Sequence, residues 1–173
     1  MKEKLLHFYD VTLCTAFGAG FWPWGPGTMG ALMGVFLWWL ASLVLPQFML
    51  MILTAIACVV VTLLSIPSIN RMEKEWGPDP SRVVIDEVVG MWISLVPVLA
   101  HRESWSQPYF TPWYWILAAF VLFRFFDIVK PTPIHQMEEF PGGVGVMMDD
   151  IMAGLFSAFI LCVAELFFLY FMI

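Results

Sequence analysis

Five carboxylates stand where apolar segments of the chain begin or end. Asp86 and Glu87 open one apolar run in VVIDEVVGMW, Asp127 closes another in FRFFDIVKPTP, and a pair of aspartates opens the last in VMMDDIMAG. An ionised carboxylate is costly to bury, and neighbouring carboxylates repel each other. A hard divalent cation offsets both costs, and Mg²⁺ prefers oxygen ligands. The candidate Mg²⁺ ligands, or orienters of ligands, are Asp86, Glu87, Asp149 and Asp150.

Basic residues flank the aspartate that closes its apolar run. Arg124, Asp127 and Lys130 are spaced three apart, so a continuing helix would place them on one face. The functional interpretation is that Arg124 and Lys130 bind a phosphate beside Asp127. The alternative is a ladder of alternating charges at a membrane surface. His135, nearby in the same acidic stretch, is a weaker candidate for proton transfer.

A glycine-rich stretch, GAGFWPWGPGTMG, precedes the first long apolar run. Thr28 fits a helix N-cap, and the free backbone N–H groups around Gly27 and Thr28 could cradle a phosphate. A structural entry loop is an equal alternative. The stretch has no GxxxxGK[ST] pattern, so it is not a nucleotide-binding P-loop.

The elements that must position these residues are apolar. The chain is 61% hydrophobic and 13% charged, against about 25% charged residues in an ordinary soluble domain. The run 48–66 has no charge and fits the roughly 20 residues of a membrane-crossing helix. We expect an all-α integral membrane bundle, a single domain over 1–173, with an interfacial helix over 3–16. The apolar runs that predict about five membrane-embedded helices are 29–45, 48–66, 88–100, 113–126 and 151–173.

The charges predict an orientation for this bundle. With a cytoplasmic N-terminus, all basic residues except Arg102 lie on the inner side, as the positive-inside rule requires. Most acids lie there as well, with Glu103 and Glu165 as the exceptions. Two runs, 88–100 and 113–126, are too short for a full crossing, so their carboxylates would stand at the lip of a recess. The aromatic belt expected at the outer interface comprises Trp105, Tyr109, Trp113, Tyr114 and Trp115.

Four ordered motifs carry a resemblance to a known family. GPGTMG, DEVVGMWI, FRFFDIVKPTPI and GGVGVMMDDIMAG resemble the phosphatidylglycerophosphatase A family of bacteria, from about Gly18 to Gly154. The resemblance implies an all-α fold and Mg²⁺-dependent removal of the terminal phosphate of phosphatidylglycerophosphate at the inner membrane. The residues it implies as the polar centre are Asp86, Glu87, Asp127, Lys130, Asp149 and Asp150, with Gly27 and Thr28 near the phosphate.

The hypothesis for the mechanism is attack by water at the cytoplasmic face. The metal would activate a water, or position one that Asp127 deprotonates, while Lys130 with Arg124 offsets the charge of the transition state. A phospho-aspartate intermediate stays open. The catalytic set is Asp86, Asp127, Lys130 and Asp149, and the substrate-binding set is Gly27, Thr28, Arg124 and Lys130.

Two rival functions belong to other classes. One is a cation or proton transporter that uses the clustered carboxylates, and the other is a structural partner of a lipid synthase. Against the transporter, the carboxylates gather at one membrane face instead of lining a path. We expect phospholipids and no nucleic acid among the partners, and the sequence makes no prediction of oligomeric state.

Overall fold

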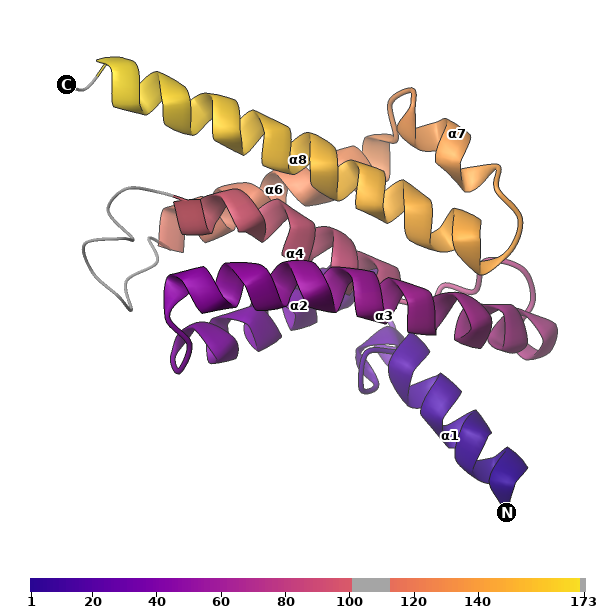
Figure 1. The fold of residues 1–173 in the computed structure, drawn as a ribbon. Helices are drawn as coiled ribbons and strands as arrows, with labels where there is room; N and C mark the ends of the chain where they lie inside the picture. Colours follow the sequence, from indigo (N-terminus) through magenta and orange to yellow (C-terminus); the bar gives the residue numbers. More distant parts are fainter. Residues whose placement is uncertain (101–112, 172–173) are drawn as a thin grey trace.

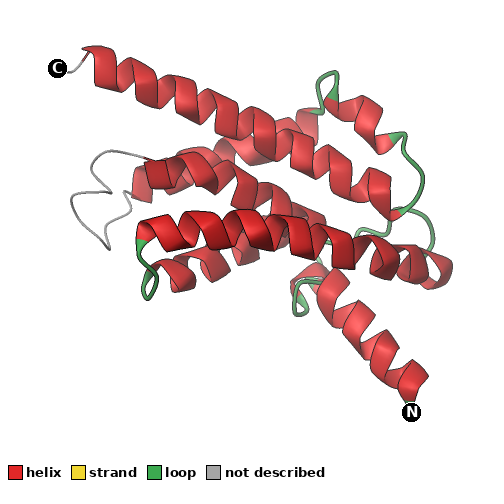
Figure 2. Ribbon diagram, in the orientation of Figure 1, coloured by secondary structure: helices red, strands yellow, loops and turns green. Residues whose placement is uncertain are grey.

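The fold is entirely helical in the part of the chain that the structure, a computed structural model, describes (residues 1–100 and 113–171). Figures 1 and 2 show helices joined by short loops and no strand in these residues, which confirms the predicted all-α class. Arg102, Glu103, Trp105 and Tyr109, which the predicted orientation places on the outer side, lie outside the described residues. The elements are α1 (Lys2–Cys14), η1 (Ala19–Phe21), α2 (Pro26–Ser42), α3 (Gln47–Trp76), α4 (Ile85–Ala100), α6 (Trp113–Val129), α7 (Ile134–Glu138) and α8 (Gly143–Phe171).

Helix α4 is the centre of the bundle. It packs against α2, α3, α6 and α8 (Figure 1). Val88, Met91 and Leu95, along its length, have 1% or less of their surface exposed. A helix that is apolar nearly all round is stable only when other helices cover it, so the four neighbours form a shell around α4.

The five helices of the bundle run alternately up and down. As a result α2, α4 and α8 begin at one end of the bundle, where α3 and α6 finish (Figure 1). Every candidate site residue belongs to a helix terminus or a loop at that end. The topology alone therefore brings segments distant in sequence to one place.

Two of the described helices, α3 and α8, are long and apolar enough to cross a membrane. α2, α4 and α6 have 17, 16 and 17 residues, and a 17-residue helix rises only about 26 Å against a hydrocarbon core of about 30 Å. Of the predicted five membrane-embedded helices, only two of the described ones are thus long and apolar enough to span a membrane, and the five-helix membrane bundle is not confirmed.

The outer surface of the bundle is strongly apolar. Only 22% of the apolar window of α3 and 28% of that of α8 is buried. Leu63 on α3, Val121 on α6 and Phe159 on α8 each expose more than half of their surface. A soluble monomer seldom exposes a contiguous apolar area of this kind.

α4 and α8 approach most closely at two glycines. A Cβ atom on Gly154 would lie 2.5 Å from the carbonyl oxygen of Gly90, and one on Gly90 would lie 2.6 Å from that of Asp150. The Oγ of Ser94 donates to the Gly90 carbonyl at 3.1 Å. Ala153, beside Gly154, is fully buried. The small residues Ala153 and Gly154, four positions after Asp149 and Asp150, thus lie where α4 packs closely against α8.

The start of α8 differs from the prediction, which placed the aspartate pair in its first turn. The helix begins at Gly143, so Asp149 and Asp150 lie in its second turn. The reason is a cap from another helix, because Asn70 Oδ1 on α3 accepts the Gly143 N–H at 2.7 Å. Gly142, with φ of +62°, makes the turn into the helix.

The start of α2 also differs by a few residues. The helix begins at Pro26 with Gly25 as its N-cap, so Thr28 lies inside the first turn and the prediction of Thr28 as the N-cap is wrong. Proline is favoured at the first helical position because it has no N–H to leave unpaired. Gly25, with φ of +70°, accommodates the turn before it.

Helix α1 is tied to α3 by an ion pair between the buried Asp10 and the partly exposed Arg71. Arg71 donates from Nε and Nη2 to the two carboxylate oxygens of Asp10, at 2.7 and 2.6 Å. Burial raises the pKa of Asp10. The hydrogen bonds from Arg71 and Ser68 and the charge of Arg71 lower it by more, so the pKa of Asp10 lies below its usual value. The N-terminal part of α1, residues 2–9, including Leu5 and Phe8, is exposed as it projects from the bundle (Figure 1).

We predict that Gly154→Val destabilises the protein by roughly 1–3 kcal/mol or more, because the new side chain collides with the α4 backbone and not with a flexible side chain. Thermal unfolding in detergent measures the effect. Leu155→Ala, at the next and half-exposed position of α8, is the control and should change the melting temperature little. Equal melting temperatures for wild type and Gly154→Val would contradict the close crossing.

Candidate active site

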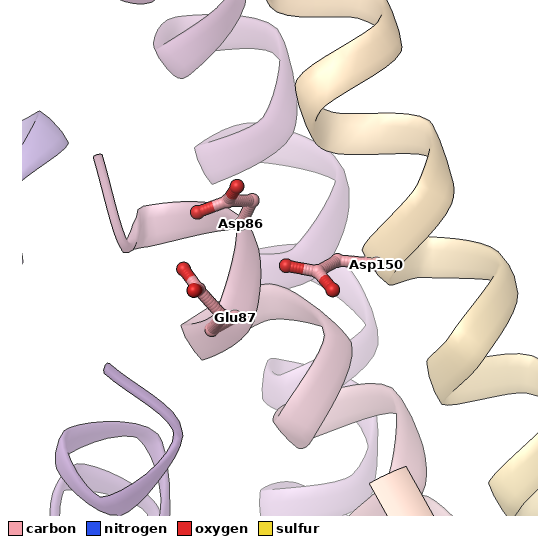
Figure 3. Close-up of side chains that lie close together, drawn as sticks. All are labelled: Asp86, Glu87 and Asp150. Carbon is pink, nitrogen blue, oxygen red and sulfur yellow. The ribbon is translucent and has the colours of Figure 1, made fainter. Parts of the chain in front are cut away.

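Three carboxylates converge where α4 meets α8. Asp86 and Glu87 extend from the first turn of α4, and Asp150 extends toward them from α8 (Figure 3). One oxygen of each lies within 4.8 Å of the others. Asp86 and Asp150 are 8% and 3% exposed. We call Asp86, Glu87 and Asp150 the carboxylate cluster.

The carboxylate cluster is poorly satisfied by the protein itself. Asp86 Oδ1, Glu87 Oε2 and Asp150 Oδ1 are buried, and no donor from the described residues reaches them. Burial of one carboxylate without a partner is unfavourable, and three within this distance also repel one another. Oxygen-only donors with free lone pairs suit a hard divalent cation such as Mg²⁺, so the residues present fit the predicted metal.

Asp149 faces a different partner from its neighbour. Lys130 Nζ donates to Asp149 Oδ2 at 2.7 Å and lies 3.4 Å from Glu138 Oε1. Burial opposes the charge on Lys130, but the hydrogen bond and charge of Asp149, with those of Glu138, outweigh it and raise the pKa of Lys130. Of the four candidate metal ligands, the structure thus brings three together and pairs the fourth with a lysine.

Arg124 and Asp127 pair with each other on α6, as their spacing predicts. Arg124 Nη1 donates to Asp127 Oδ2, and both side chains are largely buried. Asp127 is also close enough to Asp150 for the two carboxylates to interact electrostatically, which places the Arg124–Asp127 pair beside the carboxylate cluster. The guanidinium keeps one buried donor, Nε, that no described residue accepts.

Lys130 does not continue the helix that carries Arg124 and Asp127. α6 ends at Val129, and Lys130 adopts a left-handed backbone with φ of +43°. Pro131 ends the helix because it has no N–H to donate. The prediction of one face shared by all three residues is therefore wrong for Lys130, whose changed direction brings it to Asp149.

The first turn of α2 lies against the carboxylate cluster and the Arg124 side chain. A Cβ atom on Gly27 would lie 2.2 Å from Glu87 Oε1 and 3.2 Å from Arg124 Nη1, so a side chain at this position would have to displace the Glu87 carboxylate. Thr28, the next residue, is half-buried in the same turn. The glycine stretch thus lies against the acids, although the sequence places more than fifty residues between them.

Two residues at this end of the bundle have roles that the sequence does not reveal. Asn70 caps α8 from α3 and so fixes where the helix carrying Asp150 begins. Glu138 completes the surroundings of Lys130 and also lies 3.3 Å from His135 Nδ1. His135 is exposed and faces Glu138 instead of the carboxylate cluster. A polar Asn directly after an apolar segment is the one signal in the sequence that could have indicated Asn70.

Comparison with known proteins gives a consistent family. Residues 12–165 match the family model described as PgpA: Phosphatidylglycerophosphatase A. The chain is 35% identical over 151 residues to phosphatidylglycerophosphatase A of Escherichia coli, covering 86% of this chain and 79% of that protein. The corresponding protein of Haemophilus influenzae is 37% identical over 150 residues, covering 86% and 83%.

A relative with a different name is more similar. A protein of Bacteroides thetaiotaomicron, provisionally named phosphatidylinositol-3-phosphatase, is 47% identical over 159 residues. The alignment covers 91% of this chain and 94% of that protein. No solved structure matches the chain significantly.

We predict that Lys130 and Asp149 stabilise the fold as a pair. In a double-mutant cycle of Lys130→Met and Asp149→Asn, each single change leaves a partly buried charge alone, whereas the double change removes both. The expected coupling is about 0.5–3 kcal/mol, measured by reversible unfolding in detergent. The exposed pair His135 and Glu138 is the matched control, and we expect less than about 1 kcal/mol there. Strictly additive losses for Lys130 and Asp149 would refute the pairing.

Proposed function

The chain belongs to the phosphatidylglycerophosphatase A family and is a phosphatase, and from this we propose that it hydrolyses phosphatidylglycerophosphate in a Mg²⁺-dependent reaction at the cytoplasmic face of a bacterial inner membrane. The products are phosphatidylglycerol and inorganic phosphate. The family match gives no support to the transporter alternative.

One observation carries the site assignment. Three buried oxygens of the carboxylate cluster and the buried Nε of Arg124 have no partner among the described residues. Gly27, which has no side chain, lies directly against Glu87 and Arg124. Unpaired oxygens suit a cation, and an unpaired Arg donor suits an anion. A phosphate ester bound together with a divalent cation supplies both partners at once.

The metal would be held by the carboxylate cluster, Asp86, Glu87 and Asp150. Bound there, Mg²⁺ would polarise the phosphoryl oxygens and neutralise charge that the carboxylates would otherwise repel. Asp149, which the sequence groups with the metal ligands, has a different proposed role. It holds Lys130 at the rim, from where the ammonium can reach a phosphate oxygen.

The other steps of the proposed hydrolysis are assigned to side chains of the protein. A water attacks the phosphorus in line, the bond from phosphorus to the glycerol oxygen breaks, and the glycerol oxygen takes up a proton. Asp127 is the candidate base for the attacking water, and Arg124 orients its carboxylate. Arg124 Nε and Lys130 Nζ are placed to stabilise charge on the phosphoryl oxygens in the transition state. Attack by an aspartate instead of water stays an alternative, which a trapped phospho-aspartate would establish.

The apolar exterior supports a position in the bilayer. We infer that α3 and α8 cross it, and that α2, α4 and α6 are embedded beside them with their charged ends at the interface. All lysines and arginines of the described residues stand at the site end of the bundle, which is the cytoplasmic end under the positive-inside rule. A lipid headgroup would then reach the carboxylate cluster from the interface.

A second substrate has a specific observation in its favour. The Bacteroides relative, at 47% identity, is named for a phosphatase of phosphatidylinositol 3-phosphate. Both lipids carry a phosphomonoester on a hydroxylated headgroup, which is joined to diacylglycerol through a phosphodiester. Arg124 and Lys130, beside the carboxylate cluster, would bind the monoester, which is common to both substrates.

We predict that the detergent-purified protein releases inorganic phosphate from phosphatidylglycerophosphate with Mg²⁺, that excess chelator abolishes release, and that added Mg²⁺ restores it. The same assay on phosphatidylinositol 3-phosphate compares kcat/KM for the second candidate. A higher value there would replace the proposed substrate and keep the site. Release that persists with chelator would remove the metal, and release from neither lipid by folded protein would refute both candidates.

We predict that Asp150→Asn and Asp149→Asn both lower turnover by orders of magnitude but differ in their Mg²⁺ dependence. Loss of a cluster oxygen should raise the Mg²⁺ concentration at half-maximal rate by at least about tenfold for Asp150→Asn. Asp149→Asn should change it much less, because Asp149 pairs with Lys130.

Binding can be followed without turnover, because a ligand that binds the folded state raises the melting temperature. Mg²⁺ should raise it for wild type and Asp149→Asn but not for Asp150→Asn. Glu139→Gln, at an exposed acid outside the cluster, is the control for the loss of one negative charge. Equal Mg²⁺ responses from both aspartate variants would contradict the division of roles.

A further inference from the structure

Arg82, in the loop before α4, lacks the carboxylate partner that the other described arginines have. Arg71 pairs with Asp10 and Arg124 with Asp127. No carboxylate of the described residues lies within ion-pair distance of Arg82, which is exposed. A free arginine at a surface is ordinary, so its immediate surroundings decide whether it is more than a solubilising charge.

The Arg82 guanidinium is held by two aromatic rings. Its Cζ lies 6.0 Å from the ring centroid of Phe21 and 5.9 Å from that of Trp76. The rings come from separate parts of the chain, since Phe21 ends η1 and Trp76 ends α3. Such contacts orient a guanidinium while leaving its N–H donors available. The backbone is fixed as well, because a Cβ on Gly20 would lie 2.0 Å from the Arg82 carbonyl oxygen.

Further exposed aromatic side chains lie in the same segment of the chain as Phe21. We call Phe17, Phe21, Trp22 and Trp24 the aromatic ridge; they expose 75%, 53%, 53% and 85% of their surface. Tryptophan prefers the membrane–water interface, where its ring is in lipid and its N–H in water. The aromatic ridge leads directly into the first turn of α2, so it stands at the site end of the bundle.

We propose that Arg82, held between Phe21 and Trp76, is a binding site for the phosphodiester of a phospholipid headgroup. At the interface the only abundant anions at this depth are lipid phosphates, which a guanidinium binds with two parallel hydrogen bonds. This inference rests on the proposed membrane position, but not on the reaction. The phosphodiester could belong to the substrate or to a neighbouring lipid.

The link to the carboxylate cluster is short in sequence and continuous in packing. Arg82 precedes Asp86 by four residues, and Val84 between them lies against Gly20 on one side and Gly30 on the other. A lipid held at Arg82 would therefore stand at the same end of the bundle as the carboxylate cluster. That position suits the diester of a substrate whose terminal monoester is at the cluster.

Native mass spectrometry of the detergent-purified full chain, titrated with dioleoylphosphatidylglycerol, tests the proposal. We expect wild type to retain the lipid and Arg82→Gln to bind it about tenfold more weakly, as for loss of a charge-assisted hydrogen bond. Arg82→Lys should recover part of the loss, and Trp76→Leu should weaken binding without removing charge. Dioleoylglycerol, which lacks phosphate, should show no difference between variants.

The control variant is Lys74→Gln, an exposed cation near the end of α3, and it should bind as wild type does. Unchanged retention by Arg82→Gln, or an equal loss in Lys74→Gln, would overturn the proposal whether or not the protein is active. The lipid source follows from adding phosphatidylglycerophosphate to Asp150→Asn with chelator. Competition for one site assigns the substrate diester, and a complex with both lipids assigns a neighbouring lipid.

Discussion

The close contact of α4 and α8 is the constraint on which the site depends. Gly90 and Gly154 have no side chains, so the two backbones approach to a distance that no larger residue would permit. That approach brings Asp150 on one helix level with Asp86 and Glu87 on the other. Wider spacing would leave two separate pairs of acids, each solvated at its own helix end, with no common space for a cation.

The carboxylates of Asp86, Glu87 and Asp150 repel one another where α4 meets α8, and this repulsion bears on the charged residues beside them. Two cations, Arg124 and Lys130, stand beside the acids, yet each is paired with a carboxylate outside the cluster. Neither cation therefore occupies the cluster oxygens Asp86 Oδ1, Glu87 Oε2 and Asp150 Oδ1, which stay without a donor from the described residues. Acids and cations are thus both present at the site without pairing completely, which suits the proposed binding of an anionic lipid together with a divalent cation.

The sequence was sufficient to predict the all-α class and the gathering of acids at one end of the bundle, because long apolar runs with acids at their ends favour packed helices that share one polar end. It could not separate the roles of Asp149 and Asp150. Adjacent helical residues point about 100° apart, and the rotation of α8 is fixed by contacts with α4 that no local pattern reports. The start of α8 could not be predicted for a similar reason, since Asn70 caps it from 73 residues away in the sequence.

The position of Asp150 has a consequence for the biogenesis of the protein. The carboxylate cluster takes Asp86 and Glu87 from the middle of the chain and Asp150 from its last helix, so the site does not exist until the last helix has been synthesised. Until α8 docks, α4 has one uncovered side, and Asp86 and Glu87 lack the third carboxylate of the proposed metal site. The final helix therefore completes both the core around α4 and the carboxylate cluster, and a chain that stops short of it has neither.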